Sequence, residues 1–104
     1  MLQDIQPHVT TLQTGLAPSA RILAAQALAG GRHGSTDTVK TALFQACTSD
    51  PCPMVRASCI DELCKLGYYD PAFLAHLEKA CNDPSEDVRT SAKSALAAMT
   101  PRKQ

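Results

Sequence analysis

One sequence motif occurs three times along this chain at nearly even spacing. The copies are Pro18-Ser19-Ala20-Arg21, Asp50-Pro51-Cys52-Pro53-Met54-Val55-Arg56 and Asp83-Pro84-Ser85-Glu86-Asp87-Val88-Arg89. Their arginines stand 35 and 33 residues apart. Repeats of this length are typical of stacked helix pairs, in which each unit contacts only its neighbours. The spacing therefore predicts a solenoid and not a closed globular fold.

Each copy of the motif is predicted to open a helix. Asp50 and Asp83 can cap, because their carboxylates accept backbone N–H groups, and the prolines that follow stand where no N–H is needed. Behind each motif apolar residues recur every three or four positions, and a partner helix with a similar stripe precedes each of these helices. The predicted helices cover residues 3–14, 19–29, 36–48, 53–66, 71–82 and 85–99.

The ends of the predicted helices and their register support the repeat. Gly30-Gly31, Gly67 and Pro101 are expected to stop the second helix of each pair. Leu43 and Leu77 stand 34 residues apart in the partner helices. The apolar residues available to the first helix are Leu2, Ile5, Val9, Leu12 and Leu16. We predict one all-α domain over residues 1–104, a right-handed α-solenoid of three repeats at about 3–30, 35–67 and 70–99.

The stretch from Asp83 to Leu96 resembles the HEAT-like repeat of phycobilisome lyases and of many bacterial scaffold proteins, as does the stretch that begins at Asp50. In that family a recurrent aspartate and arginine form a structural ladder between units. The resemblance implies that Arg21, Asp50, Arg56, Asp83 and Arg89 tie neighbouring repeats together. Gly15 stands where the first aspartate would be, so we expect one rung of the ladder to be missing.

Composition and charge narrow the possible partners and location. Ten basic and ten acidic residues give a formal net charge of zero, which argues against nucleic acid or an anionic membrane as the main partner. The sequence has no run of 18 apolar residues and no basic segment followed by an apolar stretch at its start. Five cysteines, an odd number, are most simply free thiols. We therefore expect a cytoplasmic location.

No pattern of reactive side chains predicts catalysis. Cys59 and Cys64 lie about 140° apart around one helix, so they cannot share a metal, and no Cys/His spacing fits zinc. His76 either lies at the edge of its apolar stripe or points to solvent. No glycine-rich loop precedes a helix as a phosphate site would require. We predict no enzyme activity, no catalytic or metal-binding residue and no cofactor, with Cys52 as the one exposed thiol.

Function is expected on the exposed side of the second helices, which lines the concave surface of such a stack. The predicted strip is shallow and partly apolar and suits a peptide or another helix, although its isoleucines are equally well explained as contacts between helices. Its residues are Ile22, Gln26, Ile60, Asp61, Cys64, Lys93 and Ala97.

These features predict a non-enzymatic scaffold, or a segment of a longer array, whose partner is another protein or peptide. Resemblance at the level of the fold leaves a bilin lyase-like, tetrapyrrole-handling subunit as the alternative. Ser91, Ser94, Ala95 and Ala98 are expected to leave a flat open surface on the last helix. That surface predicts end-to-end self-association or flanking repeats.

Overall fold

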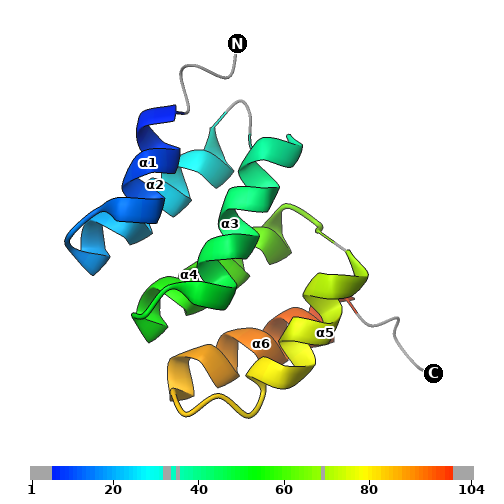
Figure 1. Cartoon of the computed structure of the whole chain (residues 1–104). Helices are drawn as coiled ribbons and strands as arrows, with labels where there is room; N and C mark the ends of the chain where they lie inside the picture. Colours follow the sequence, from blue (N-terminus) through cyan, green and yellow to red (C-terminus); the bar gives the residue numbers. More distant parts are fainter. Residues whose placement is uncertain (1–5, 32–33, 35, 69, 100–104) are drawn as a thin grey trace.

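The computed structural model describes residues 6–31, 34, 36–68 and 70–99, which form helices and turns without a strand in that part of the chain. Its helices are α1 (Gln6–Thr14), α2 (Pro18–Gly30), α3 (Asp37–Ser49), α4 (Pro53–Lys65), α5 (Pro71–Ala80) and α6 (Glu86–Met99). They form two layers, with α1, α3 and α5 in front of α2, α4 and α6 (Figure 1). The prediction of an all-α helical repeat is confirmed.

Helix boundaries agree with the predicted ones to within two residues wherever the structure describes them. The predicted start of the first helix lies outside the described residues, as do Leu2, Ile5 and Pro101. Leu16 was expected in the stripe of the first helix, and this is wrong. It follows the end of α1 and is 99% exposed, because the chain turns toward α2 before the next inward-facing position is reached.

The second helices pack more closely with one another than the first helices do. Helix α4 lies along both α2 and α6, whereas α1 and α3 touch over a shorter length and α3 and α5 approach least. The stack therefore bends toward the second-helix layer. This layer forms its inner side, where the sequence analysis placed the concave surface.

Aromatic side chains fill the wider gap between α3 and α5. The ring of Phe44 lies 6.1 Å from Phe73 and 6.2 Å from Tyr68, measured between centroids, and Tyr68 lies 5.2 Å from Phe73. His76 packs edge-on against Phe44 at 6.2 Å. Large rings thus replace close helix contact at this point. They also settle the position of His76, which lies at the edge of the core.

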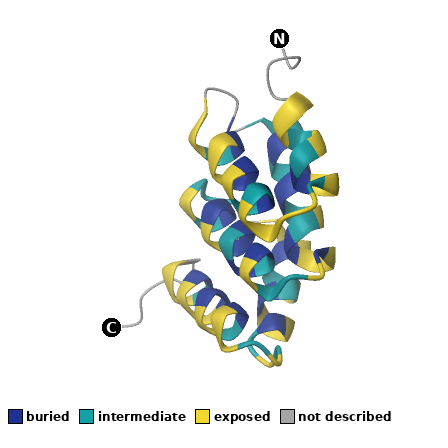
Figure 2. Ribbon diagram, turned by 90° about the vertical axis from the view of Figure 1, so that its left-hand side faces the viewer, coloured by how far each residue is buried: buried dark blue, intermediate teal, exposed yellow. Residues whose placement is uncertain are grey.

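The core runs continuously through all three helix pairs, with exposed positions on the outer helix surfaces (Figure 2). Leu43 and Leu77, which share a register, are both fully buried. Ser91 and Ala95, expected on an open end surface, are also buried. That expectation is wrong because both residues line the contact between α6 and α4.

The turn after α4 is fixed by Gly67. Its φ of 72° lies in the left-handed region that glycine adopts at little cost. The Gly67 N–H donates to the carbonyl of Cys64 at 3.0 Å, and the Tyr68 N–H donates to that of Leu63 at 3.2 Å. This is a Schellman motif, so Gly67 ends α4 as predicted.

Candidate functional site

The first rung of the ladder joins the first and second helix pairs. Arg21 Nε donates to Asp50 Oδ2 at 2.8 Å and Arg21 Nη2 donates to Oδ1 at 3.1 Å. This two-point geometry matches the planar fork of a guanidinium to a carboxylate. Both side chains are buried, and the hydrogen bond with Asp50 raises the pKa of Arg21. The Cys52 N–H also donates to Asp50 Oδ1, at 2.9 Å.

The second rung joins the second and third pairs with longer contacts. Arg56 Nη2 lies 3.4 Å from each carboxylate oxygen of Asp83, and each side chain is about one-fifth exposed. The Ser85 N–H donates to Asp83 Oδ1 at 2.8 Å. The sequence analysis predicted that Asp50 and Asp83 cap the helices that follow them. In the structure neither aspartate caps its helix directly. Each instead holds a turn by accepting the N–H two residues further on.

Each arginine also binds the turn before its own helix. The Nη1 groups of Arg21, Arg56 and Arg89 donate to the carbonyls of Gly15 at 2.7 Å, Asp50 at 3.0 Å and Asp83 at 2.8 Å. The backbone part of the rung is thus present at all three turns. Gly15 supplies no carboxylate, but both contacts between the three described pairs have their arginine–aspartate rung, so the expectation of a missing rung is wrong for these pairs.

The residues proposed for the concave strip differ in how far they are buried. Ile60 is fully buried, so it belongs to the core and not to the exposed strip. Ile22 and Cys64 are half-buried and pack against that core. The exposed members are Gln26, Asp61, Lys93 and Ala97. The face of the second helices is therefore more polar than the sequence suggested.

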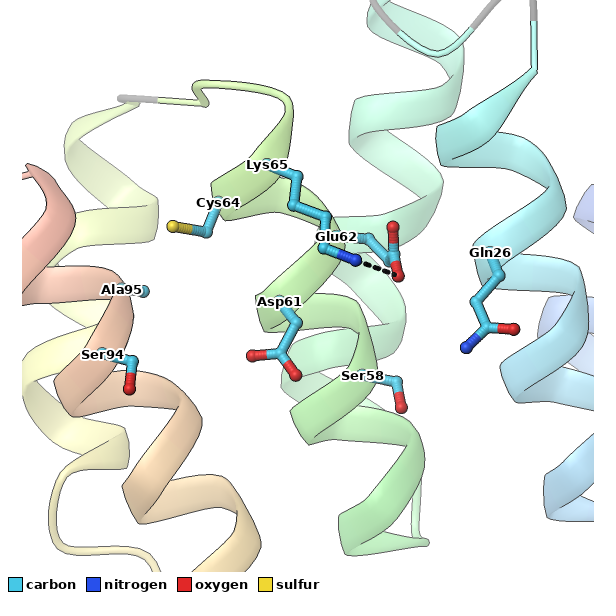
Figure 3. A pocket seen from close by; sticks show the side chains of 8 residues that line it. All are labelled: Gln26, Ser58, Asp61, Glu62, Cys64, Lys65, Ser94 and Ala95. Carbon is cyan, nitrogen blue, oxygen red and sulfur yellow. Dashed lines mark ion pairs between the residues drawn. The ribbon is translucent and has the colours of Figure 1, made fainter.

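A hollow of about 320 Å³ crosses α2, α4 and α6 on this face (Figure 3). Ser58 and Glu62 project from α4 on the side of α2, while Asp61 and Cys64 project on the side of α6. Glu62 lies 3.5 Å from Lys65, whereas Asp61 forms no ion pair with any residue that the structure describes. Asp61 is the exposed anion in this hollow.

A second hollow of about 300 Å³ adjoins the first between the starts of α4 and α6. It shares Ser58 and Asp61 with the first hollow and adds the carboxylates of Glu86 and Asp87. Met54, 57% exposed, supplies an apolar surface beside these acids. We call the two adjoining hollows the acidic groove.

The sequence analysis missed Met54, Glu86 and Asp87 as groove residues. Glu86 and Asp87 are in the first turn of α6, where a negative charge interacts favourably with the helix dipole. This structural role was enough to explain their presence in the sequence. Met54 lies one residue past a proline at the start of α4. The signal that could have found them is the shared register of α4 and α6, which brings the first turns of the two helices together.

A third hollow, of about 490 Å³, is bordered by residues of α3, α4, α5 and α6. Its basic side chains are Arg56, His76 and Lys79. Two of these three side chains are poorly suited to bind an anion. Arg56 is bonded to Asp83 and to the turn at Asp50. Burial lowers the pKa of His76, which is therefore neutral at pH 7. We read this hollow as part of the repeat contact.

All five cysteines are free thiols. Burial raises the pKa of Cys59 to about 12 and also raises the pKa of Cys47, which makes both poor nucleophiles. Cys52, Cys64 and Cys81 are half-buried. In the described ranges no three His, Cys, Asp or Glu side chains gather as a metal site would require.

The fold and the ladder define an α-helical repeat protein. HEAT repeats are matched over residues 6–97, which include nearly all of the six helices, and the chain belongs to this family. Curated proteins give no match, and neither do solved structures. Among the described helices none is both long and apolar enough to cross a membrane.

Proposed function

We propose that this chain is a non-enzymatic protein-interaction scaffold and that it binds a segment of its partner along the acidic groove. HEAT repeats commonly mediate contacts between proteins, which supports the general role. The observation that carries the specific role is the groove itself, an elongated hollow region with Asp61, Glu86 and Asp87 along it and Met54 at one end. A cytoplasmic location is part of the proposal, because the free thiols suit a reducing compartment.

The groove predicts the chemistry of the bound segment. Lys65 lines the groove, and its ammonium already lies 3.5 Å from the carboxylate of Glu62. Lysine or arginine side chains of a partner would complement the acids, and an apolar side chain would cover Met54. A helix or extended peptide with both kinds of residue fits this surface.

Two designed helical peptides of equal length, one of lysine and leucine and one of glutamate and leucine, test the proposal. Fluorescence anisotropy should show binding of the lysine peptide, weakening as salt is added. Asp61→Lys and Asp87→Lys should each weaken it by roughly fivefold. Glu78→Lys makes the same charge change on exposed α5, in the outer layer, and should leave binding unchanged. Equal loss in all three variants, or a preference for the glutamate peptide, would overturn the proposal.

The resemblance to phycobilisome lyases keeps a tetrapyrrole-handling role as a second candidate. Cys52 supports it only as a half-buried thiol in the turn before α4, next to the exposed Pro51. Absorbance after incubation with a bilin separates the two roles. A shifted spectrum that Cys52→Ser abolishes would favour the lyase-like role, and an unchanged spectrum would favour the scaffold.

A further inference from the structure

Arg89, the last arginine of the ladder, makes only the backbone contacts of the ladder within the described residues. Arg89 Nη1 donates to the carbonyls of Asp83 at 2.8 Å and Pro84 at 3.0 Å. Arg21 and Arg56 add a carboxylate of the following unit to the same backbone contact. Within the described residues, Arg89 has no carboxylate partner. The backbone contacts therefore hold the guanidinium in position, and its remaining N–H groups can donate to a further partner.

Lys93 adds a second positive charge to the same face of α6. It lies four residues after Arg89, so the two side chains share one side of the helix. Ala25 and Ile60 occupy the same register in α2 and α4, and both are fully buried where the next second helix packs. Lys93 is exposed instead. The outer face of α6 therefore differs from the inner repeat contacts by its charge.

The contact between the first and second pairs shows what could neutralise these charges. There α4 presents Asp50 to Arg21, and Glu62 projects from α4 on the side of α2 (Figure 3). Glu62 follows Asp50 by twelve residues. A unit with both acids, stacked on α6 as the second pair stacks on the first, would bring a carboxylate to Arg89 and another toward Lys93.

We propose that the outer face of α6, defined by Arg89 and Lys93, binds a helix-pair repeat of another protein that carries an aspartate in its turn and a glutamate twelve residues later. This surface is separate from the acidic groove, and the proposal does not depend on that groove. Charge complementarity selects the partner. A bidentate aspartate fits the free edge of Arg89, and the glutamate fits the ammonium of Lys93.

A second copy of this chain does not meet the requirement. Its first unit has Gly15 and Ala27 at the registers of Asp50 and Glu62, and both are uncharged. Head-to-tail stacking would place Lys93 near Ala27, which stands at the register of Glu62. Burying an ammonium against an apolar side chain without a counter-charge is unfavourable. Charge complementarity therefore favours a partner with acids at these two positions over end-to-end self-association.

The probe is a copy of residues 36–67 appended directly to the full chain, which presents the acid pair at high local concentration. In this extended chain Arg89→Ala should lower the melting temperature by roughly 4 °C. The same substitution in the original chain should give a smaller shift, because only two backbone contacts are lost. Lys93→Ala should behave in the same direction.

The matched control is the same extension with Asp50→Ala and Glu62→Ala made in the appended copy alone. With the control extension, the effects of Arg89→Ala and Lys93→Ala should return to those in the original chain. Equal effects with both extensions would overturn the proposal. Sedimentation of the unmodified chain gives a second readout, and self-association abolished by Arg89→Ala would overturn the requirement for acids.

Discussion

His76 is a polar side chain in a largely apolar position. It packs against Phe44, and its Nε2 atom is buried without a hydrogen-bond partner among the described residues. Burial lowers the pKa of His76, and the nearby Lys79 acts in the same direction. Burial is the largest influence, so the native fold favours the neutral imidazole, although a backbone hydrogen bond at Cys47 acts on the pKa in the opposite direction.

This placement predicts how stability changes with pH. A histidine in the unfolded chain takes up its proton near pH 6.5, whereas native His76 does so only at lower pH. As the pH falls through this interval the unfolded state binds more protons, so the free energy of unfolding decreases. Urea unfolding between pH 7.5 and 5.5 should show a larger loss for the parent chain than for His76→Gln. Parallel losses in the two proteins would contradict the placement of His76.

At the scale of single helices, two glycines test how the helices end, because the backbone requires a glycine at one of them and not at the other. Gly67 has a φ of 72°, so an alanine there should cost about 1–2 kcal/mol. Gly30 is the last residue of α2, and a Cβ added to it would contact nothing within 4 Å. Gly30→Ala should therefore be neutral or stabilise the protein by up to about 1 kcal/mol. Urea denaturation of the two variants checks the opposite signs, and destabilisation of similar size in both would contradict this account.

The helices were the most predictable part of the molecule, because the repeated motif and the apolar periodicity depend on local sequence. The surfaces were less predictable. Ile60 and Gln26 both lie off the main apolar stripe, yet Ile60 is fully buried and Gln26 is exposed. The difference arises from the close packing of α4 with both neighbouring second helices, and a single helix pattern does not contain it. The prediction for Leu16 was wrong for a related reason, since the exposure of this side chain depends on where α1 ends.

At the scale of the whole molecule, the ladder and the core have different roles. The core residues of each pair are continuous with those of the next, so burial alone favours stacking. The contacts of Arg21 and Arg56 add direction, because each of these two guanidinium groups joins the turn before its own helix to the aspartate of the following unit. Together they predict that the three pairs unfold as one unit.

A double-mutant cycle on Arg56 and Asp83 tests the central claim that the repeated arginine couples neighbouring pairs. Arg56→Ala should lower the free energy of unfolding by about 1–3 kcal/mol, whereas Lys65→Ala, at a side chain 72% exposed, should change it by no more than about 0.5 kcal/mol. The double variant should be more stable than the sum of the two single changes predicts, by about 1 kcal/mol. Additive changes, together with equal effects of Arg56→Ala and Lys65→Ala, would show that this rung does not hold the stack together.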